Sequence, residues 1–512
     1  MYNILRGIFT IQINLASFNP LAADITFNAK SIIDLLRAPA PKADLLVLPE
    51  AALCGCPLFD LFDDKRLLSQ AAPALKNIAK ETKDTAVVFG LAERVNKESS
   101  TALAFIYKGK VTKIYDCETV DFKGLHLQLV LGMPDDKNFS PDPDADIVLF
   151  LMARPYLKGN LTPRLESLKK YAKKHAQPAL MCNLLGGGDG MIFDGLTAAA
   201  DKKGNLVLLG EPFKEQVLTY DTEAAYNPVS YEMPWQEELI NALAFGLRDY
   251  VHKSGLDKVV FGLSGGIDSA FTAALAAKAL GGESVYCVSL PSYCTSDLSK
   301  SLAGQLARSL GVNLEEIGVM PGLTALKESF AHIVSHPKDA TEQELQSRLR
   351  TTILGALATE YNAMLLSTDD KSESAVGAFI LYGDAGGALR PIGDLYKSEI
   401  YELAAYLNQT QEVIPQGIIE RAPTSELRPN QKDEDQLPPY AALDKILRLY
   451  FEEQLTAAEI AKKCHTKLET VIDVLTRINA AELKRSQTAP ALEVSAHPLN
   501  GVRWPVIKKI NL

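Results

Sequence analysis

Short apolar runs alternate with polar or amphipathic stretches along the N-terminal half of the chain. Runs of six to eight residues that are rich in Val, Ile, Leu and Phe are typical of buried β-strands. They cover residues 43–49, 85–90, 102–107 and 145–152. Residues 165–176 (LESLKKYAKKHA) instead repeat their apolar positions at helical spacing, which predicts an amphipathic helix.

The alternation of predicted strands and helices stops at residues 226–235 (YNPVSYEMPW), which contain two prolines and show no periodicity of apolar positions. We therefore expect two domains, residues 1–232 and 233–512. In the second, predicted helices at 237–251, 298–310 and 343–359 alternate with predicted strands at 258–263, 284–291, 313–319 and 362–368. Strands separated by helices of this length predict a parallel sheet with right-handed crossovers.

Composition narrows the class of protein. The 512 residues carry a net charge of −10, which disfavours a nucleic-acid-binding surface. No uncharged apolar run is long enough to span a membrane, and we interpret the start of the chain as a first strand and not as a signal peptide. Seven scattered cysteines fit a reduced, cytoplasmic protein better than a disulfide framework or a zinc site.

One loop carries a clear chemical signal. Residues 259–282 read VVFGLSGGIDSAFTAALAAKALGG, a strand, a loop of small residues and a helix. Glycines and a helix N-terminus bind phosphate oxygens, and Ser264 and Ser269 can add hydroxyl groups. Asp268 fits beside phosphates only if Mg²⁺ lies between them. The alternative interpretation is an ordinary turn between a strand and a helix.

SGGIDS resembles the pyrophosphate-binding loop of the ATP pyrophosphatase superfamily, and later stretches select one member. Residues 365–397 resemble the NAD synthetase signature T-G-N-K-S-E, Y-G-D and P-x-D-L-x-K. Residues 422–447 and 484–487 (KRSQ) resemble two further motifs of that family. The resemblance implies a doubly wound parallel-sheet domain like the adenine nucleotide alpha hydrolases, which amidates deamido-NAD using ATP and Mg²⁺.

The resemblance also implies the site residues. It gives Asp268 and Lys397 a catalytic role, and it gives Asp268 and Glu373 the metal. The predicted ATP-binding residues are Gly262, Ser264, Gly265, Gly266, Asp268, Ser269, Thr368 and Lys397. The predicted deamido-NAD-binding residues are Glu344, Arg348, Glu373, Asp384 and Lys484. Each of three residues also has a purely structural interpretation. Glu373 would be a solvated charge at the start of a helix, and Lys397 would be a surface lysine. Asp384 would only cap the segment that follows it.

Some family positions have changed. Gln343 and Glu344 replace a Glu-Asn pair, and Asp369 and Asp370 replace a Gly-Asn pair. A carboxylate at position 344 is unfavourable near an anionic substrate unless it is paired with a cation. These changes leave open that the chain is a related ATP pyrophosphatase that acts on another carboxylate.

The N-terminal half resembles the nitrilase-like (carbon–nitrogen hydrolase) domain of glutamine-dependent NAD synthetases, which implies an αββα sandwich. The matching stretches begin at Leu46 and Leu184, and Glu50 matches the catalytic base. The family's catalytic Lys is replaced by Cys117, and its nucleophilic Cys by Gly132. A further motif of the family ends in a lysine, and Asn160 stands near that position in this sequence. We therefore predict a vestigial glutaminase in which Glu50 remains.

The predicted function is ATP-dependent formation of NAD from deamido-NAD and ammonia by a cytoplasmic homo-oligomer, a dimer or an octamer. Two alternatives remain open besides the change of substrate. One is an active glutamine-dependent enzyme with a displaced nucleophile, for which Cys117 is the candidate. The other is a degenerate scaffold that only binds nucleotide.

Overall fold

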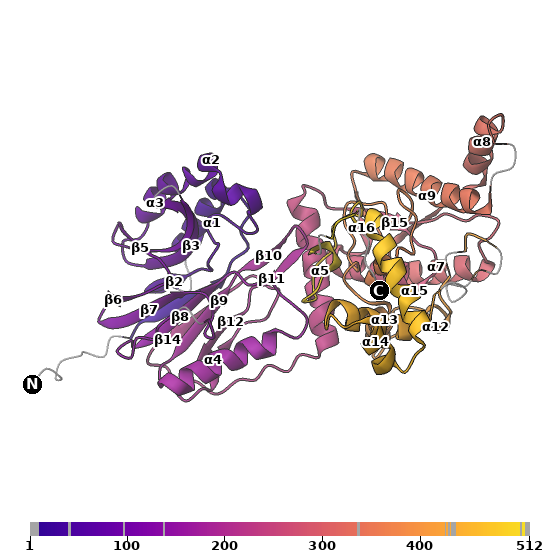
Figure 1. Ribbon diagram of the computed structural model, residues 1–512. Helices are drawn as coiled ribbons and strands as arrows, with labels where there is room; N and C mark the ends of the chain where they lie inside the picture. Colours follow the sequence, from indigo (N-terminus) through magenta and orange to yellow (C-terminus); the bar gives the residue numbers. More distant parts are fainter. Residues whose placement is uncertain are drawn as a thin grey trace, which may run out of the picture. The chain divides into compact units, whose positions relative to one another are not determined.

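The computed structural model describes residues 10–38, 42–95, 98–136, 139–334, 338–424, 426–428, 431, 437–501 and 504–506. The chain divides into two compact units, Met1–Pro234 and Trp235–Leu512 (Figure 1). The boundary expected from the sequence lies two residues before this division. Residues 1–9 of the expected first strand, and residues 425, 429–430 and 432–436 of the motif at 422–447, lie outside the described residues.

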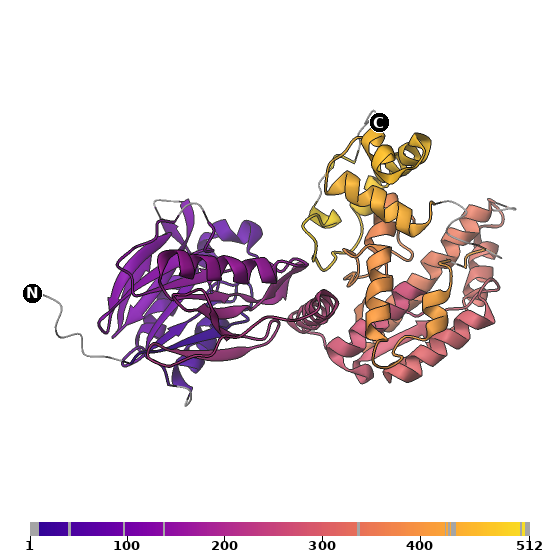
Figure 2. The same ribbon diagram turned by 90° about the horizontal axis from the view of Figure 1, so that it is seen from below.

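Two six-stranded sheets form the first unit within the described residues (Figures 1 and 2). One has the order β14-β1-β2-β3-β4-β5 and the other β13-β12-β9-β8-β7-β6. The bounds are β1 Gln12–Ser17, β2 Leu45–Val47, β3 Ala86–Val95, β4 Glu98–Tyr107, β5 Lys110–Ile114, β6 Cys117–Phe122, β7 Leu125–Leu131, β8 Ile147–Met152, β9 Ala179–Asn183, β12 Thr197–Ala200, β13 Leu206–Leu209 and β14 Gln216–Asp221. A hairpin of β10 (Leu185–Gly188) and β11 (Met191–Asp194) stands apart.

Both faces of these sheets are buried, which explains why their central strands read as continuous apolar runs. In β3, Val88 belongs to the core cluster that joins the two sheets, whereas Val87 and Phe89 pack with helices on the outer face. Helices α1 (Ile25–Arg37), α2 (Lys65–Leu68) and α3 (Ala71–Ala79) accompany the first sheet, and α4 (Leu161–His175) packs on the second. The layers confirm the αββα sandwich that the sequence predicted.

The second unit has a parallel sheet with the order β17-β16-β15-β18 in the described residues. These strands are β15 Val259–Gly262, β16 Val285–Ser289, β17 Asn313–Glu316 and β18 Met364–Leu365. Numbered along this unit, the order is 3-2-1-4, so the direction of winding reverses between β15 and β18. Doubly wound sheets bind their ligands beyond the carboxyl ends of the strands at such a switch point.

Helices surround this sheet and form a separate group at the C-terminal end, drawn in yellow in Figure 2. Their bounds are α5 Trp235–Lys253, α6 Ile267–Leu280, α7 Asp297–Leu310, α8 Met320–Phe330, α9 Asp339–Tyr361, α10 Lys371–Val376, α11 Lys397–Leu407, α12 Gln416–Glu420, α13 Tyr440–Phe451, α14 Ala457–Cys464, α15 Leu468–Ala480 and α16 Glu482–Arg485. Apolar residues of α13, α14 and α15 share a core with Ala375 and Val376 of α10, which ties the C-terminal helices to the switch point. None of the described helices has the length and apolar character needed to cross a membrane.

Candidate active site

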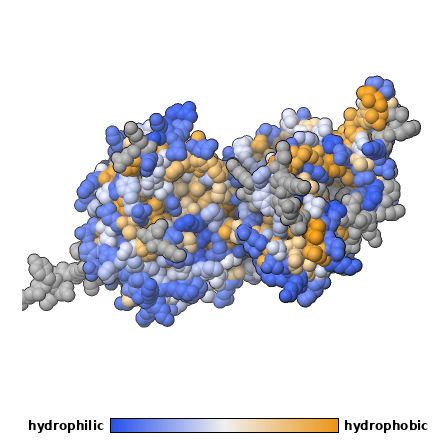
Figure 3. All heavy atoms as spheres, in the orientation of Figure 1, coloured by the Kyte–Doolittle hydropathy of each residue, from blue (hydrophilic) through white to orange (hydrophobic). Residues whose placement is uncertain are grey.

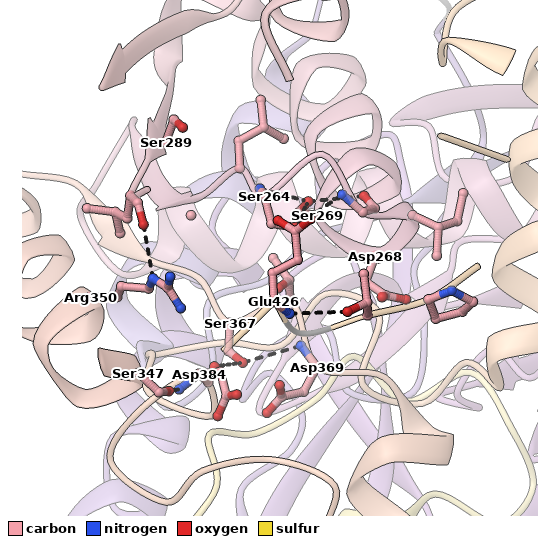
Figure 4. A pocket seen from close by; sticks show the side chains of 18 of the residues that line it. Ser264, Asp268, Ser269, Ser289, Ser347, Arg350, Ser367, Asp369, Asp384 and Glu426 are labelled. Atoms are coloured by element: carbon pink, nitrogen blue, oxygen red, sulfur yellow. Dashed lines mark hydrogen bonds between the residues drawn. The ribbon is translucent and has the colours of Figure 1, made fainter. Parts of the chain in front are cut away.

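A cavity of about 240 Å³ lies beyond the carboxyl ends of the strands, at the switch point. Its wall is built from the loops that follow β15, β16 and β18, from α9, and from residues 421–424, 426 and 427. Figure 4 shows Ser264, Asp268 and Ser269 on one side of it, and Asp369, Asp384 and Ser347 on another. Of the predicted ATP-binding residues, those that line the cavity are Gly262, Ser264, Gly266, Asp268, Ser269 and Thr368.

The loop after β15 is held by its own small side chains. The Ser264 hydroxyl accepts a hydrogen bond from the Gly266 N–H at 3.2 Å and lies 3.0 Å from the Ser269 hydroxyl. Gly265 has a φ of +78°, and a Cβ there would lie 2.4 Å from the Ser299 carbonyl oxygen, so only glycine fits. Among the described residues, α6 has no side-chain cap at Gly266, and the N–H groups at a helix N-terminus are suitable donors for an anion.

Lys397 forms the centre of a buried cluster of charges. Its Nζ lies 2.7 Å from Asp268 Oδ2, 2.7 Å from Asp370 Oδ2 and 2.8 Å from Glu373 Oε1. The Lys397 side chain is fully buried, and that of Glu373 is 18% exposed. The interpretations of Lys397 as a surface lysine and of Glu373 as a solvated charge are therefore wrong.

Three helix N-termini bring these groups together. Asp268 lies in the first turn of α6, Lys397 begins α11, and Asp370 caps α10 by accepting the Glu373 N–H at 2.8 Å. The positive ends of helices favour carboxylates, whose charge would otherwise be costly to bury. Asp444 of α13 accepts hydrogen bonds from the Ser372 hydroxyl and the Ser398 N–H, and so fixes α10 against α11.

The pKa values in this cluster reflect burial and mutual charge. Burial raises the pKa of Asp370 to about 7 and that of Glu373 well above its usual value. Burial alone would lower the pKa of Lys397, but Asp268, Asp370 and Glu373 together hold it well above the ordinary lysine value. Lys397 therefore stays charged throughout the physiological pH range.

The three carboxylates offer a donor set that fits Mg²⁺. One oxygen of each of Asp268, Asp370 and Glu373 lies within 4.8 Å of the others, and Asp268 Oδ1 has no hydrogen-bond partner in the part of the chain that is described. Carboxylate oxygens are the ligands that Mg²⁺ prefers. Sequence reasoning missed Asp370, although the change from a neutral Asn to Asp at that position was the signal for it.

A second acidic group lies on the other side of the cavity. Burial raises the pKa of Asp369 to about 7 and that of Asp384 to about 6. Asp384 Oδ1 accepts the Ile380 N–H at 2.6 Å, so Asp384 both lines the cavity and stabilises a local turn. Only Asp384 had been predicted as a site residue.

Three of the predicted deamido-NAD residues do not line the cavity. Glu344 and Arg348 form an ion pair of 2.7 Å on α9, where both are about half exposed. Lys484 Nζ donates to the Gly377 and Phe379 carbonyl oxygens at 2.9 and 2.6 Å. The carboxylate of Glu344 is thus paired with a cation, which is the condition under which a negative charge at this position is tolerable near an anionic substrate. The binding roles of these residues stay predictions.

A hydrogen-bond network that the sequence did not reveal links Arg421 and Glu426 to Ser299, which lies against residues 264–269, the loop after β15 that we call the phosphate-type loop. Glu426 accepts hydrogen bonds from the Ser296 and Ser299 hydroxyls at 2.9 Å and pairs with Arg421 at 2.6 Å. Ser299 is also the residue whose backbone lies against Gly265. The residues of this network are about 130 positions apart in the sequence, so no local sequence pattern could predict it.

Charged side chains lie in the region around Glu50 and Gly132, where the sequence predicted a vestigial glutaminase site. Glu50 is largely buried, its Oε2 accepts the Ala153 N–H at 3.0 Å, and burial raises its pKa. Gly132 has a φ of +130°, and a Cβ there would lie 2.3 Å from Asp136 Oδ2. That oxygen also accepts from the Met133 N–H and pairs with Arg154 at 3.1 Å. Asp136 thus occupies the space that a side chain at position 132 would need.

The comparisons with known proteins agree with this geometry. A family model described as NAD synthase matches residues 239–488. The glutamine-dependent NAD(+) synthetase of Xanthomonas campestris is 34% identical over an alignment of 526 positions that covers 95% of each chain. That of Thermotoga maritima is 31% identical and covers 96% of this chain and 97% of its own. The chain belongs to the glutamine-dependent NAD(+) synthetase family.

A solved structure extends this result. The glutamine-dependent NAD(+) synthetase from Acinetobacter baumannii, in complex with ADP, aligns with a TM-score of 0.75 and 28% identity over 97% of this chain and 98% of its own. The enzyme from Cytophaga hutchinsonii aligns with a TM-score of 0.85 at 20% identity over 98% of both chains, which supports the fold alone. Membership of the family confirms the predicted fold class and the enzyme class, a carbon–nitrogen ligase that makes NAD.

Replacing Lys397 tests the charge cluster. The Lys397→Met variant leaves three carboxylates close together without a cation, so we expect the second unit to lose about 3–5 kcal/mol of stability. Added MgCl₂ should raise the melting temperature of this variant more than that of the unchanged protein, because the metal would take over the charge.

Lys371→Met is the matched control, since Lys371 is equally buried but pairs with the single carboxylate of Asp394. Its melting temperature should fall without recovery by MgCl₂. Equal recovery of both variants, or of neither, in thermal denaturation with and without MgCl₂ would contradict the three-carboxylate site.

Proposed function

We propose that this chain amidates deamido-NAD at the expense of ATP, and that it takes its nitrogen from free ammonia. The observation that carries the proposal is the cluster of Asp268, Asp370, Glu373 and Lys397 beside an uncapped phosphate-type loop at the switch point. A relative from A. baumannii has been solved in complex with ADP, which supports binding of an adenine nucleotide by this family.

The chemistry requires two steps because a carboxylate does not react with ammonia. In the first, an oxygen of the substrate carboxylate attacks the α-phosphorus of ATP, and pyrophosphate leaves. In the second, ammonia attacks the carbonyl carbon of the acyl-adenylate, AMP leaves with the bonding electrons, and a proton is released. The product is the amide, NAD.

The chain's own groups have separate tasks in this scheme. Backbone N–H groups of Gly265 and the first turn of α6, together with the Ser264 and Ser269 hydroxyls, hold the departing pyrophosphate. Thr368 lies on the opposite loop and contacts the nucleotide. Lys397 fixes the positions of the carboxylates that carry the metal. Mg²⁺, held by Asp268, Asp370 and Glu373, would supply the positive charge that offsets the phosphates.

Geometry at the vestigial site supports ammonia as the nitrogen source. A glutaminase of this type needs a thiol nucleophile and a lysine beside its glutamate base. Position 132 is a glycine, and its side-chain space is taken by Asp136. Asn160 Nδ2 donates to the Pro155 carbonyl oxygen and offers no positive charge. The relatives compared above are named as glutamine-dependent, so this chain would differ from them.

Two other thiols are poor substitutes for the missing nucleophile. Cys117 begins β6, the edge strand of the second sheet, and pairs with Val130 of β7. Burial and, to a smaller extent, the nearby charge of Glu50 together raise the pKa of Cys56 to about 11. A thiol with this pKa is almost entirely protonated at neutral pH and is a weak nucleophile.

Comparison of the two nitrogen donors tests this proposal. NAD formation from deamido-NAD, ATP and MgCl₂ should proceed with ammonium chloride and be at least about 100-fold slower with glutamine. Cys117→Ser should leave the ammonium-supported rate unchanged. Glutamine-supported turnover that Cys117→Ser abolishes would establish the displaced-nucleophile alternative instead.

Deamido-NAD as the substrate is part of the same proposal. The change to Glu344 does not leave an unpaired negative charge, because Arg348 compensates it. AMP release measured with deamido-NAD and with a panel of other carboxylic acids separates this substrate from the alternatives. The membership of the chain in an enzyme family speaks against the scaffold interpretation.

We also propose that the chain acts as a cytoplasmic homo-oligomer. In α8 and the residues after it, Leu326, Ile333 and Val334 are 39%, 75% and 42% exposed, whereas Leu323 of α8 is buried. Figure 3 shows hydrophobic side chains gathered at this end of the second unit. Apolar side chains gathered in this way on a surface are typical of a protein interface.

Charge introduced at this surface should weaken the assembly. Ile333→Asp combined with Leu326→Asp should shift the mass in solution toward the monomer, measured by size exclusion with light scattering. Glu328→Gln, at an exposed position of the same helix, is the control and should leave the mass unchanged. An unchanged mass in the double variant would rule out this surface as the interface.

A further inference from the structure

Helix α10 provides two of the three carboxylates that would hold the metal, yet it is only six residues long. It begins at Lys371, directly after its capping residue Asp370, and it includes Glu373. A helix of this length is not stable on its own in water, so its position depends on contacts with the rest of the chain. The contacts that hold α10 therefore also determine where these two carboxylates lie.

Arg390 links α10 to a stretch after α16, residues 489–500, which we call the C-terminal segment. Arg390 is 2% exposed, and its Nη1 atom donates to the Ser374 hydroxyl of α10 at 2.5 Å. Its Nε atom donates to the Ala489 carbonyl oxygen at 2.8 Å, and its Nη2 atom donates to Asn500 Oδ1 at 2.7 Å. The planar guanidinium group thus uses its fixed set of donors to join the helix to both ends of the segment.

Lys371 forms a second link between α10 and the C-terminal segment. Its Nζ atom donates to the Ser495 hydroxyl and to the His497 carbonyl oxygen, both at 2.8 Å. Asp394 completes this link, because its Oδ1 atom lies 2.9 Å from Lys371 Nζ and its Oδ2 atom accepts the Ser495 N–H at 2.7 Å. Together with Arg390, this link fixes the segment to the helix at four of its residues.

The C-terminal segment does not take part in the cavity itself. All of its residues are described, and none of them lines the cavity, whose described wall ends in the sequence at Leu427. Burying cations is costly unless their donors are satisfied, and Arg390 and Lys371 are satisfied largely by this segment. The segment therefore serves the orientation of α10 and not a direct contact with substrate.

We propose that the C-terminal segment positions the metal-binding carboxylates of α10, with Arg390 and Asn500 as positioning residues. Arg390 acts through Ser374, the neighbour of Glu373 in the helix, and Asn500 acts by holding Arg390. This inference rests on the proposed function, because it concerns the metal that the reaction would use. Groups that orient the ligands of a metal without touching it commonly change metal affinity by about 10- to 100-fold when they are replaced.

Binding of Mn²⁺ to the whole protein without substrates tests the proposal. Free Mn²⁺ gives a sharp EPR spectrum that broadens on binding, so a titration yields Kd. Asn500→Ala should raise this Kd about 10-fold, because Arg390 loses the acceptor that fixes it. Asn500→Asp is the conservative variant and should leave Kd unchanged, since a carboxylate oxygen also accepts from Arg390. Arg390→Lys should weaken binding as Asn500→Ala does, because an ammonium group cannot reproduce the guanidinium fork.

The dependence of turnover on MgCl₂ separates positioning from general stability. Asn500→Ala should need about 10-fold more MgCl₂ for half-maximal NAD formation, while kcat at saturating MgCl₂ and KM for deamido-NAD stay near those of the unchanged protein. A variant that is only partly folded would instead lose kcat at every MgCl₂ concentration. Leu243→Ala is the matched control, because Leu243 of α5 is fully buried in the same unit but does not line the cavity. It should lower the melting temperature and leave Kd for Mn²⁺ unchanged.

Two results would overturn the positioning role alone. One is the same Kd for Mn²⁺ in the unchanged protein, Asn500→Ala and Arg390→Lys, and the other is an equal rise of Kd in Leu243→Ala. If the unchanged protein bound no Mn²⁺, the metal site of the proposed function would fall, and the positioning role with it. The unchanged protein therefore tests the proposed function, and the difference between the variants and the unchanged protein tests the C-terminal segment.

Discussion

One buried ammonium group holds the reaction site of this protein together. Lys397 neutralises part of the charge of Asp268, Asp370 and Glu373, and these residues come from two different helix N-termini. Without Lys397, the carboxylates would repel one another and could not be buried at this distance. Since Asp268 belongs to the phosphate-type loop and Glu373 to a motif a hundred residues later, the pairing sets the position of both sides of the cavity.

The two units differ in what their residues retain of the family motifs. The first keeps the layers, the buried strands and the glutamate of a nitrilase-like domain, yet Asp136 fills the space beside Gly132. The second keeps its carboxylates and gains two of them, Asp369 and Asp370. Core packing constrains which residues the first unit keeps, whereas the balance of charges around the cavity constrains which residues the second unit keeps.

Much of this could be predicted from the sequence because it is local. The strand, glycine loop and helix at residues 259–282 reveal the phosphate-type loop, and alternation of strands and helices reveals the parallel sheet. The short antiparallel strands β5, β6, β10 and β11 carry weak patterns and were not predicted. The partners of Lys397 depend on tertiary packing. So does the position of Glu344 and Arg348 on α9 outside the cavity wall, which no local pattern reveals.

A crystal structure with a non-hydrolysable ATP analogue and Mn²⁺, which stands in for Mg²⁺ and gives an anomalous signal, tests the central claim most directly. The account predicts a metal peak about 2.0–2.3 Å from oxygens of Asp268, Asp370 and Glu373, with the triphosphate against Gly265 and Gly266. A metal bound elsewhere, or a triphosphate away from that loop, would contradict it.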